Sequence, residues 1–438
     1  MIILAIETSC DDTCIAVVEA DKRGYLRGIT RMKLEIKSNI VSSQVKIHAK
    51  YGGVYPFLAK REHQRNLPIV LKKALGEAGF EISNFQPGTR AKPRTRAELG
   101  SGLSRTELRS GAGLGAGLVP HRNKVSGTGF PISKKNSNTK SQIPNIDLIA
   151  VTVGPGLEPC LWTGVNFAKD LSRKWEKPLI PVNHIEAHIF ANFVRVNSKF
   201  QIPNFKTIFP AICLVVSGGH TQLILMKDFG QYKILGETRD DAAGECFDKT
   251  ARILGLGYPG GPAIAAEAAK LQTTNYKPQT KLPRPMIHQK NFDFSFSGLK
   301  TAVLYDFENR PLKIRKSPKE SLRLPTGQAK KYIRAMAAEI QQAIIDVLIG
   351  KTIRAAKEFK TKSIILGGGV AANNELRKQF NYKLKTLTYK LNFFVPPKKL
   401  CTDNAAMVAI TGYFNYLKGK IGKIKNWENI KVNANLRI

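Results

Sequence analysis

The sequence predicts an α/β protein with a duplicated core, arranged as two lobes with a cleft between them. Strand and helix patterns alternate along the chain, which is typical of this class. A strand, polar turn and strand at residues 4–18 are echoed about 200 residues later, at residues 213–225. A length of 438 residues suits two or three domains, or one two-lobed enzyme.

The individual elements follow from short apolar runs bounded by turn residues, and from longer runs with helical periodicity. The first lobe, residues 1–205, is expected to hold strands at 2–6, 14–19, 147–153 and 178–183, then a helix at 185–194. The second lobe, residues 206–438, is expected to hold strands at 211–216, 222–226 and 363–366, with helices at 240–254, at 329–359 and from about 371. The terminal helix is expected to pack back on the first lobe.

Composition changes sharply between residues 86 and 144. These 59 residues contain eleven Lys or Arg, two Glu, nine Gly and a single aromatic residue, Phe130. So little apolar material cannot form a core, and the segment is predicted to be a basic, disordered or weakly ordered insert. It is either an arm that contacts RNA or a tolerated surface insertion.

The whole chain is strongly basic, with 69 Lys and Arg against 33 Asp and Glu and a formal net charge of +36. This excess predicts a polyanionic partner, most simply a nucleic acid, although a basic bias of the whole proteome gives the same balance. No apolar run reaches about 18 residues and the N-terminus lacks a signal-peptide pattern, so no membrane segment is expected. Six scattered cysteines, without any C-x-x-C, fit a reducing cytoplasm.

His184 and His188 stand four residues apart where a strand is expected to pass into a helix. Residues i and i+4 lie on one helical face, so both imidazoles can point at one metal ion. The alternative is a pair of histidines on a helix surface. Glu186 does not directly follow the first histidine, which is not the order found in zinc proteases.

Two glycine-rich turns follow strands, at residues 217–219 and 367–369. Glycine lets the backbone approach a ligand and leaves N–H groups free for an anion, although tight loop packing requires the same residues. Neither turn fits a P-loop or a Rossmann motif. Asp240 and Asp241 are predicted to cap a helix. Asp403 is predicted to be either a helix cap or a third metal ligand.

Eleven short stretches, which cover nearly the full length except the insert, form a recognisable pattern. They are residues 6–13 (IETSCDDT), 42–44 (SSQ), 51–56 (YGGVYP), 154–157 (GPGL), 183–188 (NHIEAH), 216–222 (VSGGHTQ), 240–251 (DDAAGECFDKTA), 258–262 (YPGGP), 294–300 (FSFSGLK), 368–373 (GGVAAN) and 401–404 (CTDN). In this order they resemble the bacterial tRNA N6-adenosine threonylcarbamoyltransferase family, once labelled O-sialoglycoprotein endopeptidases.

The resemblance implies the actin-like, sugar-kinase-like fold with a nucleotide cleft between the lobes. It implies that one metal, Fe²⁺ or Zn²⁺, is held by His184, His188 and Asp403. It implies transfer of a threonylcarbamoyl group from threonylcarbamoyl-adenylate to N6 of the adenosine 3′ to the anticodon, in tRNAs that read codons beginning with A. The residues expected to contact the adenylate are Val215, Val216, Ser217, Gly218, Gly219, Asp248, Gly261 and Asn373.

Asp11, in the first turn, is the candidate for orienting or deprotonating the acceptor amine. The resemblance also implies two protein partners, a degenerate paralogue and a small P-loop ATPase, and a cytoplasmic location. The chain departs from the family at Glu158-Pro159, at Asn374 and in the insert. Competing readings are a metallopeptidase, a small-molecule kinase of the same fold and a non-catalytic nucleic-acid binder.

Overall fold

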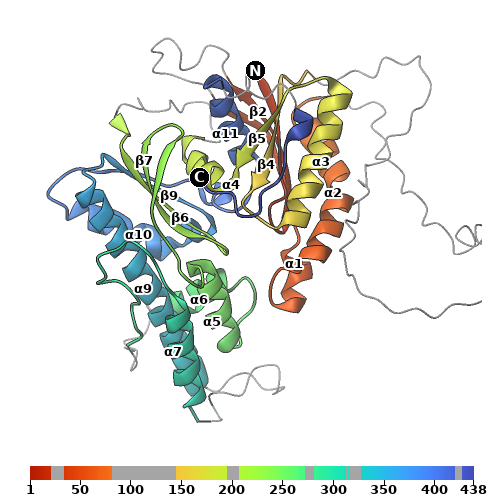
Figure 1. Cartoon of the computed structure of the whole chain (residues 1–438). Coiled ribbons are helices and arrows are strands. Elements are labelled where there is room, and N and C mark those ends of the chain that lie inside the picture. The colour runs from red at the N-terminus through yellow and green to blue at the C-terminus, as the bar shows by residue number, and fades with distance from the viewer. Residues whose placement is uncertain are drawn as a thin grey trace, which may run out of the picture. The chain divides into compact units, whose positions relative to one another are not determined.

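The computed structural model describes residues 1–20, 34–80, 145–194, 207–271, 281–311, 314, 327–419 and 427–438 (Figure 1). The predicted insert at residues 86–144 lies outside these ranges, and so does the predicted boundary between residues 205 and 206. Residues 1–82 and 143–438 fold as one compact unit, which holds all the elements named below.

The first half of this unit contains a five-stranded mixed sheet in the order β3-β2-β1-β4-β5. β1 is antiparallel to β2, β2 is antiparallel to β3, and β4 and β5 continue the sheet parallel to β1. The strands are β1 (Ile2–Glu7), β2 (Asp12–Ala20), β3 (Leu34–Ser43), β4 (Leu148–Gly154) and β5 (Leu179–Asn183).

The second sheet repeats this plan in the order β8-β7-β6-β9-β10. β6 is antiparallel to β7, β7 is antiparallel to β8, and β9 and β10 run parallel to β6. The strands are β6 (Ala211–Val216), β7 (Thr221–Asp228), β8 (Gln231–Glu237), β9 (Ser363–Gly367) and β10 (Asn392–Phe394). The same strand order and the same directions in both sheets confirm the predicted α/β fold with a duplicated core, of the actin-like, sugar-kinase-like class.

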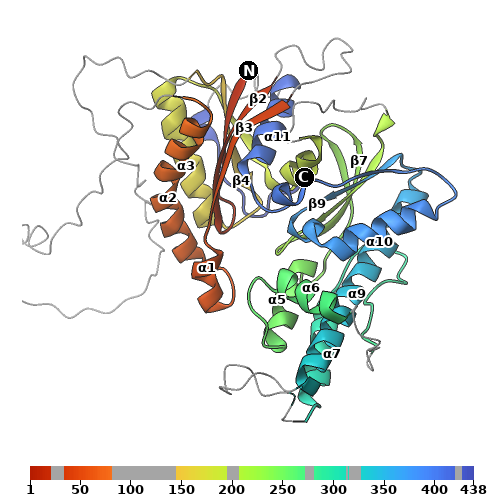
Figure 2. The ribbon, with the colours of Figure 1, turned by 180° about the vertical axis from the view of Figure 1, so that it is seen from behind.

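Helices cover both faces of the first sheet (Figure 2). One face carries α2 (Pro56–Glu77) and α3 (Glu158–Trp175), and the other carries α4 (His184–Phe190) and α11 (Ala405–Leu417). The short helices α1 (Val45–His48) and η1 (Ala49–Tyr51) precede α2, and η2 (Ala191–Phe193) follows α4. α11 therefore reaches the first sheet from the far end of the chain.

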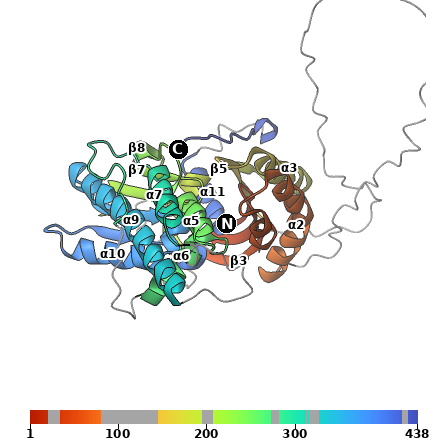
Figure 3. The ribbon, with the colours of Figure 1, turned by 90° about the horizontal axis from the view of Figure 1, so that it is seen from below.

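β6 separates two hydrophobic cores because its side chains alternate between the two faces of the sheet. Ala211, Cys213 and Val215 join the core that contains α4, α11 and the first sheet. Ile212, Leu214 and Val216 join a second core, against the helices grouped on the other face (Figure 3). Those helices are α5 (Ala243–Ile253), α6 (Gly260–Leu271), α7 (Ser297–Glu308), α9 (Gly327–Glu358) and α10 (Asn374–Lys385).

The prediction that Asp240 and Asp241 cap a helix is wrong. α5 begins at Ala243 and its N-cap is Ala242, which has no side chain to cap the helix; the Thr221 hydroxyl accepts the Ala243 amide at 2.9 Å. Asp240 instead accepts hydrogen bonds from the Ser295 and Ser297 hydroxyls, and Asp241 pairs with Lys249 at 2.6 Å. Asp240 is thus paired with residues 295–297, which lie far away in the sequence, and Asp241 is paired with a lysine eight positions later, on α5 itself.

The C-terminal residues 427–438, including η6 (Trp427–Asn429), return to the first sheet. The Asn433 amide donates to the Val153 carbonyl at 2.9 Å, and the Gly156 amide donates to the Ala434 carbonyl at 3.1 Å. None of the helices in the described part of the chain combines the length and apolar character that crossing a membrane requires.

Candidate active site

His184 and His188 lie on α4, which begins directly where β5 ends. Asn183 closes the strand and caps the helix, because its Oδ1 accepts hydrogen bonds from the amides of Ile185 and Glu186, at 2.8 and 3.1 Å. The cap fixes His184 as the first helical residue. His188 follows one turn later on the same face, and the two ring centroids lie 4.6 Å apart in an edge-on arrangement.

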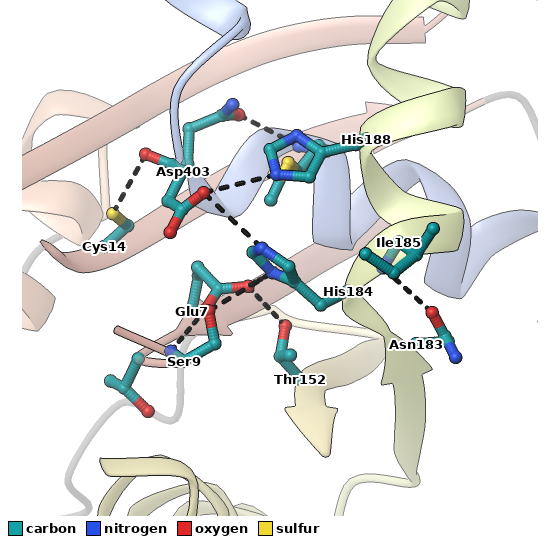
Figure 4. A network of polar contacts seen from close by, with 12 residues as sticks. Glu7, Ser9, Cys14, Thr152, Asn183, His184, Ile185, His188 and Asp403 are labelled. Atoms are coloured by element: carbon teal, nitrogen blue, oxygen red, sulfur yellow. Dashed lines mark hydrogen bonds and ion pairs between the residues drawn. The ribbon is translucent and has the colours of Figure 1, made fainter. Parts of the chain in front are cut away.

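Asp403 comes from the loop between η5 (Lys398–Leu400) and α11. The cap of α11 is Asn404, whose Oδ1 accepts the Met407 amide at 3.1 Å, so the Asp403 carboxylate is left free. Asp403 Oδ1 lies 3.5 Å from His184 Nε2 and 3.3 Å from His188 Nε2 (Figure 4). The fold thus brings Asp403 next to two histidines that lie more than 200 positions earlier in the sequence.

The chemistry of these three side chains suits a divalent metal ion. Their potential ligand atoms all lie within 4.8 Å of one another. His188 is fully buried; its Nδ1 makes no hydrogen bond, and its Nε2 lies 3.3 Å from Asp403 Oδ1. A divalent cation would give Nε2 and that carboxylate a shared partner in this buried place. Two imidazoles and one carboxylate, with positions left open, are a donor set that fits iron(II) or zinc.

Glu7 is a functional residue that the sequence analysis missed. It ends the otherwise apolar β1 and is fully buried. Its Oε2 lies 3.1 Å from His184 Nδ1 and accepts a hydrogen bond from the Thr152 hydroxyl at 2.6 Å. Holding Nδ1 in this way directs the other nitrogen, Nε2, toward Asp403. The available signal was a single carboxylate at the end of a buried strand.

The electrostatics of this group favour a positive charge between the carboxylates. Burial acts to lower the pKa of His184, but Asp403 and Glu7 outweigh burial and raise it to about 9. Burial acts to raise the pKa of Asp403, but His184 and His188 hold it well below its usual range. Glu7 behaves in the same way, because His184 outweighs burial and lowers its pKa. Both carboxylates are therefore held in their charged form.

Replacing Glu7 by Gln is expected to weaken metal affinity by roughly 10- to 100-fold, the usual cost of losing an outer-shell partner of a metal-bound histidine. The reason is that an amide neither fixes the His184 tautomer nor supplies a negative charge. Metal titration calorimetry on the purified chain measures this. The matched control is Glu186→Gln on α4, also buried, and an equal loss of affinity in both variants would contradict the assigned role of Glu7.

Glu186 does not contact the side chains of His184, His188 and Asp403, the group that could hold a metal, which we call the metal-binding group. Its Oε1 accepts a hydrogen bond from the Tyr232 hydroxyl at 2.8 Å, and its Oε2 lies 3.5 Å from Asn415 Nδ2. These contacts tie α4 to β8 and α11. The side chain that a peptidase would need as a base is therefore engaged in packing the helix.

A cavity of about 590 Å³ lies beside the metal-binding group. Four of the predicted adenylate contacts line it, namely Gly218, Asp248, Gly261 and Asn373. Thr402, directly before Asp403, lines it as well. All the lining residues among those described come from the second half of the chain. A ligand in this cavity would therefore contact Thr402, whose neighbour in the chain, Asp403, belongs to the metal-binding group.

The other predicted adenylate contacts shape the turn between β6 and β7 and do not line the cavity. Val215 and Val216 are buried in β6. The Ser217 amide donates to the His220 carbonyl at 2.8 Å, and the Ser217 hydroxyl accepts the His220 amide at 3.1 Å. These two bonds close the turn and leave Gly218 and Gly219 exposed at its tip.

The second glycine turn contributes Gly369 to the cavity. Gly368 before it has φ +86°, a left-handed conformation that favours glycine, and a Cβ there would lie 2.3 Å from the Val216 carbonyl oxygen. Gly367 ends β9 against α4, where a Cβ would lie 2.8 Å from the His188 carbonyl oxygen. Glycine is thus required where the second sheet approaches the metal-binding helix.

Asp248 and Asn373 are held by contacts within the second half of the chain. Asp248 Oδ1 accepts the Gly260 amide at 2.6 Å, and burial raises the pKa of this carboxyl despite that bond. Asn373 Oδ1 accepts the Leu376 amide and caps α10, while its Nδ2 donates to Gln341 Oε1 at 2.9 Å. Gln341, on α9, also lines the cavity and had no sequence signal.

Asp11 lies in the turn between β1 and β2 and is not among the residues that line the cavity. Burial raises the pKa of its carboxyl, the Cys10 thiol opposes this, and the charge of Asp403 adds to it. Its neighbour Asp12 is more strongly affected: burial, with the negative charges of Asp403 and Asp11, raises the pKa of Asp12 to about 7.

Two of the three departures from the family pattern, Glu158-Pro159 and Asn374, lie among the described residues. Glu158 and Pro159 are the first residues of α3, where proline needs no amide hydrogen bond, and Glu158 Oε1 accepts the Trp162 indole N–H at 3.4 Å. Asn374 is the first residue of α10 and lines the cavity.

All six cysteines are free thiols.

Comparison with known proteins agrees with this geometry. The family model described as TsaD, tRNA N6-adenosine threonylcarbamoyltransferase, matches residues 35–86 and 132–410. A tRNA N6-adenosine threonylcarbamoyltransferase of Thermosipho africanus (strain TCF52B) is 40% identical over 423 residues, 96% of each chain. One of Syntrophomonas wolfei subsp. wolfei (strain DSM 2245B / Goettingen) is 40% identical over 415 residues, 95% of this chain and 92% of that protein. The chain belongs to the TsaD family of tRNA N6-adenosine threonylcarbamoyltransferases.

Proposed function

We propose that the chain transfers the threonylcarbamoyl group of threonylcarbamoyl-adenylate to N6 of the adenosine 3′ to the anticodon, in tRNAs that read codons beginning with A, and releases AMP. One observation carries the assignment of the site. Thr402 lines the cavity and Asp403, the next residue, belongs to the metal-binding group. An adenylate in the cavity would present its acyl end to that group.

The reaction needs little covalent assistance from the protein. The N6 nitrogen attacks the carbamoyl carbon, the bond from that carbon to the phosphate oxygen breaks, AMP leaves and N6 loses a proton. Iron(II) or zinc, held by His184, His188 and Asp403, would supply Lewis acidity toward the threonylcarbamoyl oxygens. The chain itself positions the donor, since bringing amine and carbonyl together accounts for much of the acceleration in such transfers.

We assign the binding of the nucleotide end of the donor to two sets of residues. Those that line the cavity are Gly218, Asp248, Gly261 and Asn373. Those that shape the β6–β7 turn are Val215, Val216, Ser217 and Gly219. Free backbone N–H groups of that turn suit the phosphate, and Asp248 suits a ribose hydroxyl. Asp11 is proposed to accept the proton that N6 loses. Burial raises the pKa of its carboxyl, which supports this role.

Replacing Gln341 by Leu is expected to raise the KM for the donor roughly tenfold, because it leaves the Asn373 amide unpaired at the edge of the cavity. Steady-state AMP release measured against donor concentration tests this. Gln342→Leu is the matched control on the same helix, since Gln342 bonds to Asp346 and Gln379 away from the cavity. Equal KM values for the two variants would rule out this role of Gln341.

We also infer that a degenerate paralogue and a small P-loop ATPase complete the working complex, in the cytoplasm. Family resemblance supports this. The free cysteines are consistent with a reducing compartment.

The competing functions have less support. A metallopeptidase needs a glutamate base beside the metal, and Glu186 is bonded to Tyr232 instead. No described feature specifically favours a small-molecule kinase. A purely electrostatic nucleic-acid binder would leave the buried metal-binding group without a purpose.

The deciding experiment combines the purified chain and its partner proteins with threonylcarbamoyl-adenylate and unmodified tRNA. We expect AMP release that depends on tRNA and is lost on chelation, and N6-threonylcarbamoyladenosine in the tRNA by mass spectrometry of nucleosides. Cells depleted of the protein should lose this nucleoside. Its retention, with no second copy of the gene present, would overturn the proposal.

A further inference from the structure

A surface rich in unpaired lysines runs from the cavity along α10 to η5. Between Leu376 and Thr402 the sequence has seven basic residues and no acidic residue. All six lysines in it are exposed. Lys378 pairs with Glu375 at 3.9 Å, and the ammonium groups of the other five make no ion pair or hydrogen bond with any described residue. We call this set the lysine surface; it consists of Lys383, Lys385, Lys390, Lys398 and Lys399.

The absence of acidic residues distinguishes this segment from an ordinary solvated face. Some ammonium groups elsewhere have carboxylate partners, as Lys249 has in Asp241 and Glu245, and Lys37 has in Glu19 and Glu35. Charges of one sign that are not offset by neighbours repel one another. Such an arrangement is stabilised by a polyanion, whose binding releases counterions.

Both ends of the lysine surface are attached to the active site. α10 begins at Asn374, which lines the cavity, and η5 leads through Thr402, which also lines it, to Asp403. A helix rises about 1.5 Å per residue, so Lys383 and Lys385 lie roughly 15 Å along α10 from the cavity. Lys398 and Lys399 lie only three or four residues before Thr402. Figures 1 and 2 show α10 and the segment after it at the β9 side of the second sheet.

An aromatic side chain accompanies these charges. Tyr382 is 66% exposed and directly precedes Lys383. Proteins that bind single-stranded regions of RNA combine basic residues, which contact phosphates, with exposed aromatic rings, on which unpaired bases stack.

We propose that the lysine surface and Tyr382 bind the acceptor tRNA, with the lysines contacting the ribose-phosphate backbone around the anticodon loop and Tyr382 stacking on an unpaired base. The substrate must reach the metal-binding group with one adenosine, so neighbouring phosphates have to lie on the surface around the cavity. This inference rests on tRNA being the acceptor, and it assigns a surface that contacts neither the donor nor the metal.

The test compares two triple variants of the full-length chain that remove the same charge. One is Lys383→Gln, Lys385→Gln, Lys390→Gln, and the control is Lys233→Gln, Lys281→Gln, Lys357→Gln, at exposed lysines on other elements. Binding of an unmodified tRNA transcript is measured by fluorescence anisotropy at several salt concentrations. The first variant should bind roughly tenfold more weakly at 0.1 M salt, and its plot of log affinity against log salt should be shallower by about two. The control should match the wild type.

Tyr382→Ala should weaken tRNA binding roughly tenfold without changing the salt slope, because stacking involves no counterion release. In turnover assays the lysine variant should raise the KM for tRNA and leave kcat and the KM for the donor unchanged. Equal tRNA affinity and salt slope in the two triple variants would overturn the proposal. Because binding is measured without donor, a failure of the proposed transfer reaction would not affect this result.

Discussion

His188→Ala is expected to remove bound metal and to slow AMP release roughly 1,000-fold. His188 Nε2 is one of three potential ligand atoms, and no other described His, Cys, Asp or Glu completes such a group. Loss of Lewis acidity costs several kcal/mol of transition-state stabilisation, and about 1.4 kcal/mol corresponds to a factor of ten in rate. Metal content by plasma mass spectrometry and single-turnover AMP release measure the two effects.

The control for this experiment is His288→Ala, at an exposed histidine outside the site, which should keep both metal and rate. Thermal unfolding of the metal-free proteins separates a chemical effect from misfolding. The metal-free His188→Ala protein should keep a cooperative transition, because His184 Nε2, 3.5 Å from Asp403 Oδ1, still pairs with that carboxylate. Wild-type transfer by a His188→Ala protein would show that the metal has no part in the reaction.

Gly244→Ala is expected to disrupt the cavity and destabilise the fold. A Cβ at this position would lie 2.5 Å from the Ser217 carbonyl oxygen and 2.8 Å from both Cα and N of Gly218. These are backbone atoms of the β6–β7 turn, so no side-chain rotation can relieve the overlap. Overpacking of this kind lowers the free energy of unfolding by about 1–3 kcal/mol. Displacing Gly218, which lines the cavity, should also raise the KM for the donor at least roughly tenfold.

Gly298→Ala is the matched control, because Gly298 is the second residue of α7 just as Gly244 is the second residue of α5. A Cβ on Gly298 would meet no atom within 4 Å. The higher helix propensity of alanine should then make this variant as stable as the wild type or more so. Chemical denaturation and donor titration compare the two, and equal behaviour would mean that the turn can move without loss.

Much of the fold could be predicted because its signals are local. The strand, polar turn and strand of residues 4–18 recur at 213–225, and the structure forms β1–β2 and β6–β7 there with the same pairing. Buried apolar strands and long periodic helices such as α9 are visible in sequence, since their patterns reflect the neighbours within one element. The start of α5 was misplaced, because Asp240 and Asp241 bond to partners more distant in sequence.

The sequence predicted the candidate metal ligands of the site but not the residues that support them. The helical spacing of His184 and His188 put both imidazoles on one face, and resemblance to the family favoured the metal role of Asp403 over the helix-cap role. Glu7 and Gln341 were missed because their importance lies in partners far along the chain: Glu7 bonds to His184 and Thr152, and Gln341 bonds to Asn373. No periodicity or spacing encodes such pairs.

The sequence by itself determined the α/β class, the repeated strand–turn–strand unit, the spacing of the two histidines and the basic charge of the chain. Only the tertiary structure decided that Asp403 leaves the capping of α11 to Asn404 and turns its carboxylate toward both imidazoles. It also decided that Thr402 joins that group to the cavity, and that Glu7 fixes His184. The physical reason is that helix and strand patterns arise between residues a few positions apart, whereas a buried charge must be paired in space, and its partners are chosen by the packing of distant elements.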